Sequence, residues 1–355
     1  MFYRLSGVYH TRYRATRQLW PLPADRWQVI VLALLALTAP LFLSRVALSS
    51  YMLPWLLFSS AALSLTLLMG IAGQLHFGFA AVMAIGAYGS IHMVQAGVPF
   101  ALALVLAGLL AAVIGCIFGA SALRVKGLYL VMATLAMQYL VDWFIVNVDA
   151  ISGGAVATLQ TPRVSFLGLP LRGLVANYYF VLAWTLLVTL LLLNIKRTSL
   201  GSALVAVRDK DFAAAVIGVN IFRYKLLAFF VSSFLGGVTG AILAFCYYGA
   251  VTAQQFSFDV SVQLVAMVLV GGLGSVIGSY LGAGVVLLVP LFLTKFVSSL
   301  AAAGWLPISI ELMANIPLML YGALIMFFLL FEPLGLAKMY DNVRKYFLVW
   351  PFRHN

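Results

Sequence analysis

Asp142 and Gln138 form a polar pair within one long apolar stretch of the chain, at 128–147. Gln138 precedes Asp142 by one helical turn, so a helix would place both side chains on the same face. An ionisable side chain is costly inside hydrocarbon and is therefore a functional candidate. Asp142 also lies near the end of the stretch, so a boundary position in contact with water stands as the alternative.

A second polar group falls in a glycine-rich stretch, Gly70-Ile-Ala-Gly73-Gln74-Leu-His76-Phe-Gly78, and 271–278 is similarly rich in glycine. Such stretches unwind membrane helices, and the resulting half-helix ends can face a transported solute. Close packing of small residues is the alternative for any single glycine. The pairs that favour packing are Gly115/Gly119, Gly236/Gly240 and Gly278/Gly282. Packing does not explain Gln74 and His76, which makes the first stretch a candidate pathway element.

Motifs of enzymes are missing from the sequence. It has no Gly-x-x-x-x-Gly-Lys-Ser/Thr loop for phosphate and no His-Glu-x-x-His motif. It shows no cluster of Cys and His and no Ser/His/Asp grouping. Cys116 and Cys246 both fall in apolar stretches, where a small apolar role is expected. We therefore predict no catalytic residue and no metal site, and the scarcity of buried carboxylates and histidines disfavours a proton-coupled carrier.

The composition indicates an integral membrane protein. Apolar residues make up 64% of the 355 residues and charged residues 8%, against about 45–50% and about 25% in soluble proteins. A membrane helix needs about 20 apolar residues, and backbone groups in lipid must be paired within the segment. We therefore predict an all-α fold with about ten spans, of which 260–297 is either two short spans or one broken helix. The spans are 28–47, 52–70, 78–95, 100–121, 128–147, 177–195, 226–248, 260–272, 279–297 and 312–331.

The distribution of Lys and Arg predicts the orientation. With the N-terminus in the cytoplasm, 17 basic residues lie inside, and four lie outside, namely Arg45, Arg163, Arg172 and Lys295. This asymmetry follows the positive-inside rule and predicts that both termini are cytoplasmic. The net charge of +12 then requires no nucleic acid, because attraction to anionic lipid headgroups accounts for it.

The hydrophilic segments divide the chain. We expect a cytoplasmic arm at 1–27 that is not a cleaved signal, a transmembrane permease domain at 28–335, and a cytoplasmic tail at 336–355. Within the membrane domain, 148–176 is predicted to be periplasmic and 196–225 to be cytoplasmic.

The internal segment 196–225 predicts two short amphipathic helices. Apolar residues recur at helical spacing from Leu200 to Val207, and Thr198 or Ser199 is a candidate N-cap. A charged run, Arg208-Asp209-Lys210-Asp211, precedes a second helix from Phe212 to Ile217 that ends at Gly218. Such a pair is either a docking surface for a cytoplasmic partner or an interfacial helix lying on the membrane.

Three motifs give the chain a family resemblance over about 50–335. They are Gly70 to Tyr88, the run from Arg197 through Arg208 to Leu226, and Phe256 to Gly278. With these motifs the chain resembles the LivM-type permease subunits of bacterial ATP-binding-cassette importers for hydrophobic amino acids. The resemblance implies a permease fold with cytoplasmic coupling helices, in the bacterial inner membrane. It also implies four kinds of partner: a second homologous permease, two ATP-binding cassette subunits, a periplasmic substrate-binding protein and membrane lipid.

The resemblance and the motifs together nominate two sets of residues. The predicted ATPase-coupling residues are Arg208, Asp209, Asp211, Phe212, Ala214, Ala215 and Gly218. The predicted translocation-pathway residues are Gly73, Gln74, His76, Phe79, Gln138 and Asp142. No cofactor is expected on this chain, because ATP and Mg would bind to the partner ATPases.

The first motif departs from the family at two positions. His76 stands where the family usually has Ser, and Phe79 stands where it usually has His. Branched-chain or other hydrophobic amino acids are the expected solutes. The alternatives are the same importer architecture for urea, short amides or aromatic acids, and a stand-alone secondary carrier.

Overall fold

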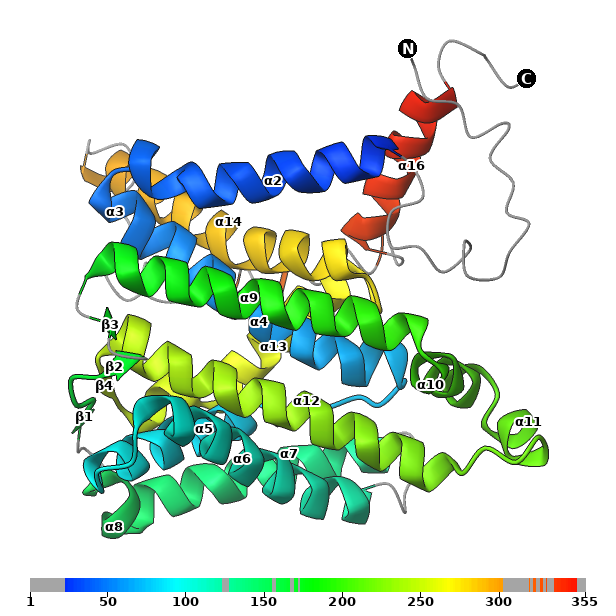
Figure 1. The fold of residues 1–355 in the computed structure, drawn as a ribbon, viewed down its shortest axis with the longest axis horizontal. Helices are drawn as coiled ribbons and strands as arrows, with labels where there is room; N and C mark the ends of the chain where they lie inside the picture. The colour runs from blue at the N-terminus through cyan, green and yellow to red at the C-terminus, as the bar shows by residue number, and fades with distance from the viewer. Residues whose placement is uncertain are drawn as a thin grey trace.

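The computed structural model describes residues 23–122, 128–154, 158–166, 169–171, 173–302 and 335–349, with a few residues between 319 and 330. Long helices lie side by side and fill this part of the chain (Figure 1). Seven of the described helices are long and apolar enough to cross a membrane, and Trp27–Phe42 and Phe79–Gln95 are shorter apolar helices. These helices agree with the helical membrane protein that the apolar composition predicts.

The first nine predicted spans each overlap a helix. The helices are α2 (Pro23–Phe42), α4 (Leu53–Thr66), α5 (Phe79–Gln95), α6 (Phe100–Ala122), α7 (Leu128–Asn147), α9 (Leu174–Arg197), α12 (Ile221–Leu243), α13 (Phe258–Gly271) and α14 (Val276–Ala302). The tenth predicted span, 312–331, lies almost wholly outside the described residues, as do residues 1–22 of the predicted arm.

The first predicted span extends too far at its C-terminal end. It was expected at 28–47, but α2 ends at Phe42, shortly after Pro40. Ser44 then caps α3 (Arg45–Ala47) by accepting a hydrogen bond from the amide of Ala47 at 3.2 Å. A serine that begins a new helix in this way separates two elements that the apolar pattern alone runs together.

The chain from 45 to 95 forms one interrupted unit. The π-helix η1 (Leu48–Met52) leads into α4, and a second π-helix, η2 (Leu67–Ile71), follows it directly. Residues 72–78 are then non-helical until α5 begins. We call residues 72–78 the first break. Its position agrees with the glycine-rich stretch that predicted an unwound segment.

The segment at 260–297 is two helices, which resolves the two sequence-based alternatives. α13 and α14 pack against each other in antiparallel fashion, because Gly271 lies against Gly278 and Gly282 lies against Met267. In both contacts a Cβ on the glycine would overlap the backbone of the opposing helix. Residues 272–275 join the two helices, and we call them the second break.

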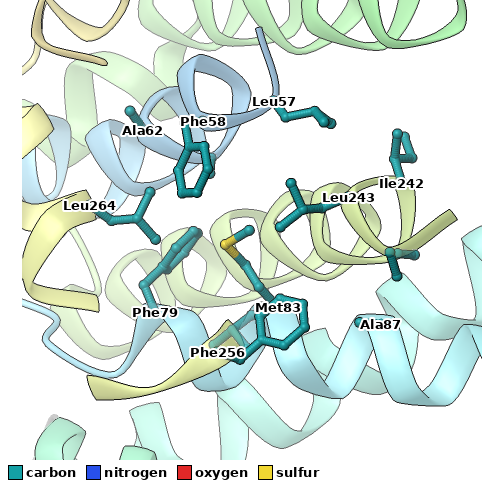
Figure 2. Packing of buried hydrophobic residues seen from close by; sticks show 14 of the residues in the cluster. Leu57, Phe58, Ala62, Phe79, Met83, Ala87, Ile242, Leu243, Phe256 and Leu264 are labelled. Carbon is teal, nitrogen blue, oxygen red and sulfur yellow. The ribbon is translucent and has the colours of Figure 1, made fainter. Parts of the chain in front are cut away.

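Helix α12 is the centre of the packing, with extensive contacts to α5 and α6. Close helix approach depends on small residues here: Gly240 lies against the Met83 backbone, and Gly115 lies against Ser233. Figure 2 shows Phe79 and Met83 within the buried cluster formed by residues from several helices. Lipid tails are as apolar as these side chains, so close van der Waals contact rather than the hydrophobic effect holds such helices together.

The two ends of the helix bundle differ. One end carries α8 (Asp149–Ser152) and four two-residue strands (Figure 1). β1 (Leu159–Gln160) pairs antiparallel with β4 (Ala250–Val251), and β2 (Ser165–Phe166) pairs with β3 (Leu169–Pro170). The other end carries α10 (Ser199–Asp209), α11 (Asp211–Val216) and α16 (Leu336–Val349). The predicted periplasmic and cytoplasmic loops therefore lie at opposite ends.

The remaining short helical elements lie between α12 and α13. The π-helix η3 (Ala244–Tyr248) extends it, and the 3-10 helix η4 (Ala253–Phe256) precedes α13. Thr252 caps η4 in a capping box, in which the Gln255 side chain accepts a hydrogen bond from the Thr252 amide.

Candidate functional site

Gln138 forms the centre of a buried polar network at the start of α5. Its side-chain oxygen accepts hydrogen bonds from the Ala81 amide at 2.9 Å and the Ser261 hydroxyl at 2.8 Å. Its side-chain nitrogen donates to the Phe256 carbonyl at 2.9 Å and to the Asp142 carboxylate at 3.0 Å. A glutamine side chain offers two donors and two acceptor sites, so the bonding capacity of Gln138 is fully used.

Amides at the start of α5 are paired with protein groups. The Ala80 amide donates to the Ser261 hydroxyl at 2.8 Å, and the Phe77 amide donates to the Thr134 hydroxyl at 3.1 Å. The first amides of a helix have no partner inside the helix and are available for an anion unless side chains cap them. Since α7 and α13 supply those side chains, in this conformation the α5 N-terminus is a structural junction.

Gln74 and His76 point into the protein. Gln74 is buried and donates to the Ala72 carbonyl at 3.2 Å. His76 is buried between the rings of Phe79 and Phe229, at centroid distances of 5.9 and 5.7 Å. Its Nδ1 accepts a hydrogen bond from the Gly78 amide at 3.1 Å, which assigns the proton of a neutral ring to Nε2. Both side chains therefore shape the first break from within.

The exposed part of the first break is apolar. Gly73 is exposed, and Leu75 exposes 42% of its surface. Gly73 also has a φ of 68°, in the left-handed region that favours glycine. Leu75 did not stand out from the sequence, because a leucine among apolar residues carries no signal of its own.

Asp142 is partly exposed on α7, next to exposed aromatic rings. Tyr139 and Trp143 expose 59% and 57% of their surfaces on the same helix. The Tyr139 ring lies 5.8 Å from the ring of Phe258, at the start of α13. A partly exposed carboxylate on a membrane helix requires water or a polar partner rather than lipid. This face of α7 thus combines an anionic group with apolar rings.

The end of η2, just before the first break, touches the second break. A Cβ added to Gly70, in η2, would overlap the backbone of Gly274 in the second break. Gly274 has a φ of 79°, so both its conformation and this close approach require glycine. The two glycine-rich stretches predicted from the sequence are therefore one structural unit.

Basic side chains from the segment around α10 bind this unit. Arg208 donates from its guanidinium to the Gly70 carbonyl at 2.7 Å. Lys196, in the last turn of α9, donates to the Gly274 carbonyl at 2.8 Å. In the sequence, Lys196 is one of the basic residues that indicate the cytoplasmic side of the membrane. Nothing in the sequence identifies its carbonyl partner.

The remaining predicted coupling residues lie on α10, on α11 and in the turn that follows α11. Asp209 is exposed and forms a 2.8 Å ion pair with Arg208, while the Asp211 carboxylate accepts a hydrogen bond from the Phe212 amide. Ala215 and Gly218 are exposed, whereas Ala214, also on α11, is buried. Phe212 exposes 79% of its surface, and Val216 and Ile217 nearby are also strongly exposed. An exposed apolar group of this kind, rimmed by charges, is typical of an interaction surface.

A bundle of long apolar helices with two neighbouring breaks and a pair of short helices at one end defines a multi-pass membrane protein of the transport-permease class. The chain belongs to the family described as branched-chain amino acid transport system / permease component, whose sequence model matches residues 47–329.

Two curated relatives resemble most of the chain. It is 28% identical over 338 residues to the high-affinity branched-chain amino acid transport system permease protein LivM of Escherichia coli, covering 88% of this chain and 74% of the relative. It is also 28% identical to LivM of Salmonella typhimurium, covering 78% and 67% of the two chains. The ribose import permease protein RbsC of Bacillus subtilis is 27% identical over 34% of this chain and 36% of its own. No solved structure gives a significant match.

Proposed function

We propose that this chain is the permease subunit of a binding-protein-dependent ATP-binding-cassette importer and forms half of its pathway for branched-chain or other hydrophobic amino acids. The observation that carries this proposal is the family match, which extends over residues 47–329 and includes both breaks and the short helices. The curated relatives with the same reach are branched-chain amino acid permeases.

The partners follow from this assignment. Two ATP-binding cassette subunits, which carry the ATP and Mg, would dock on α10 and α11, and the exposed side chains of Phe212, Val216 and Ile217 support that surface. A second homologous permease would complete the pathway in the bacterial inner membrane. A periplasmic substrate-binding protein would contact the opposite end, where β1 to β4 lie. In this arrangement the termini and the short helices are cytoplasmic.

Within the pathway the residues divide into two roles. Asp142 and the exposed rings beside it are suited to a zwitterionic amino acid with an apolar side chain, because a carboxylate attracts its ammonium group. Gly73, with the neighbouring Leu75, gives the first break an exposed surface. Gln74, His76, Phe79 and Gln138 are buried, and their role is to position those surfaces.

The test is ATP-dependent uptake by the reconstituted complex. The chain is co-expressed with two ATP-binding cassette subunits, a sister permease and a binding protein of the same kind of importer, and the purified complex is placed in vesicles. We expect uptake of labelled leucine that needs ATP and binding protein and that isoleucine and valine inhibit. Inhibition by urea or short amides alone would reassign the solute. Ion-driven uptake by the chain without partners would contradict the importer.

A further inference from the structure

We propose that Arg208 and Lys196 are positioning residues that connect the short helix α10 to the two breaks and make the breaks move when α10 moves. This inference rests on the proposed function, because it concerns how ATPase movement reaches the pathway. It assigns a role to the hydrogen bonds from Arg208 to Gly70 and from Lys196 to Gly274, which neither the membrane topology nor the docking of the ATPases requires.

Arg208 holds two groups at once. One guanidinium nitrogen, Nη1, donates to the Gly70 carbonyl at 2.7 Å, while Nε donates to Asp209 at 2.8 Å and Nη2 pairs with the same oxygen. The Gly70 carbonyl is near the end of η2, where carbonyls lack helical partners and attract cations. The aliphatic part of Arg208 also lies against Gly73, so the side chain spans the start of the first break.

Lys196 makes the corresponding contact on the second break. Its ammonium group donates to the Gly274 carbonyl at 2.8 Å, just before α14 begins at Val276. Charge-assisted hydrogen bonds of this kind are stronger than neutral ones. Arg208 of α10 thus bonds the last turn before the first break, and Lys196, in the last turn of α9 directly before α10, bonds the second break.

Helix α10 is packed firmly enough to carry a movement. Leu204 and Val207 are buried, and Leu204 belongs to one apolar cluster with Leu67, Leu68 and Ile71 of η2. At about 1.5 Å per residue, the 11 residues of α10 form a rigid element about 16 Å long. A shift of this helix would therefore act on η2 through side-chain packing and through Arg208, and a shift of its junction with α9 would act on the second break through Lys196.

Contact between η2 and the second break makes the two connections interdependent. Because Gly70, near the end of η2, lies directly against the Gly274 backbone, neither segment can shift alone without a clash or a gap. Interiors packed in this way change between discrete arrangements rather than deforming smoothly. We infer that α10, the two cations and the two breaks switch together.

The principal test replaces Arg208 with lysine in the complete reconstituted importer. Lysine keeps the charge but lacks the planar fork that binds Gly70 and Asp209 together. We expect ATP hydrolysis to continue while the amount of leucine imported per ATP falls by about fivefold or more, the lower range of coupling effects. Arg223→Lys is the matched control, because Arg223 is exposed at the start of α12 and, among the residues that the structure describes, its guanidinium bonds neither break.

A second measurement reports the break itself. Leu75→Cys, in a chain whose Cys116 and Cys246 are replaced with alanine, gives an exposed thiol in the first break for a water-soluble maleimide. We expect the labelling rate to change when ATP is added, and the change to disappear in Arg208→Lys or Lys196→Met. The double variant of Arg208→Lys and Lys196→Met should lose no more of the ATP-dependent labelling change than the more severe single variant, since the effects of substitutions in contacting elements are not additive.

The outcomes are distinguishable. A wild-type complex that imports leucine, with unchanged import per ATP and unchanged ATP-dependent labelling in both single variants, overturns this inference and leaves the proposed function intact. A wild-type complex that does not import leucine contradicts the proposed function instead. If Arg208→Lys does not co-purify with its partners, Asp209→Asn is tested instead. In that variant Arg208 keeps its hydrogen bond to the Gly70 carbonyl but loses the carboxylate that orients its guanidinium. An unchanged import per ATP in Asp209→Asn and Lys196→Met likewise overturns the inference.

Discussion

The Ser261 hydroxyl donates a 2.8 Å hydrogen bond to the side chain of Gln138 and so joins α13 to α7 at the start of α5. The same hydroxyl accepts the amide of Ala80, and the same glutamine oxygen accepts the amide of Ala81. Three helices thus meet at two side chains. The start of α5 is therefore fixed by protein groups at this junction rather than by a bound solute.

Gln138→Leu is expected to destabilise the fold. The substitution leaves the Ala81 amide and the Phe256 carbonyl without their partner, and each buried unsatisfied group costs about 1–3 kcal/mol. We expect the melting temperature in mild detergent to fall by several degrees. Asn147→Ala is the control, because that exposed side chain donates to the Trp143 carbonyl of its own helix. Equal melting temperatures for Gln138→Leu and wild type would contradict the junction.

Asp142→Asn tests the proposed pathway face. Asparagine retains an oxygen that can accept the hydrogen bond of Gln138, so the fold should persist while the negative charge is lost. A hydrogen bond to a charged group contributes about 1.5–3 kcal/mol, and we expect leucine uptake to fall by about tenfold or more. Asp259→Asn, at an exposed carboxylate in the first turn of α13, is the control. Wild-type uptake in Asp142→Asn would remove Asp142 from the pathway.

Phe212→Asp should separate ATP hydrolysis from transport. The ring exposes 79% of its surface, so its loss leaves the membrane fold intact, while a carboxylate would be buried without a partner at a docked surface. We expect import per ATP to fall strongly, measured in vesicles that contain the whole complex. Phe212→Leu keeps the apolar contact and should behave as wild type. Unchanged coupling in Phe212→Asp would place the ATPase contact elsewhere.

Gly70→Ala should disrupt the contact between η2 and the second break. A Cβ at this position overlaps the Gly274 backbone, which cannot rotate away as a side chain can. Overpacking of this kind costs about 1–3 kcal/mol, and we expect a lower melting temperature and lower yield of monodisperse protein. Gly173→Ala is the matched control, because a Cβ there meets nothing within 4 Å and the φ of −125° suits alanine. Equal behaviour of the two variants would refute the close approach.

Much of the helical layout could be predicted because membrane spans depend on local composition. A run of about 20 apolar residues is sufficient to indicate a helix in lipid, and α6, α7 and α9 agree closely with their predicted ranges. The end of the first span could not be placed in this way, because it depends on Ser44 as a cap. The second helix of the internal segment was predicted within one residue, since Gly218, with a φ of 88°, marks its end.

The roles of individual polar residues were harder to predict because they depend on distant partners. Gln138 and Ser261 lie 123 positions apart, and Arg208 and Gly70 lie 138 positions apart. Backbone carbonyls and amides are the partners in most of these contacts, and every residue has them. The sequence therefore placed Gln74 and His76 in an unwound segment, but it could not indicate that both side chains point inward.

The hairpin of α13 and α14 also constrains how the chain enters the bilayer during synthesis. The 14 residues of α13 reach about 21 Å, which is short of the hydrocarbon thickness of about 30 Å. Together with η4, however, it makes the 19-residue stretch Ala253–Gly271 that is long enough to cross, whereas the 27 residues of α14 are long enough by themselves. Since Gly271 and Gly278 bring the two backbones together, we expect the ribosome to release both helices before either is settled, so that biogenesis treats them as one inserting unit.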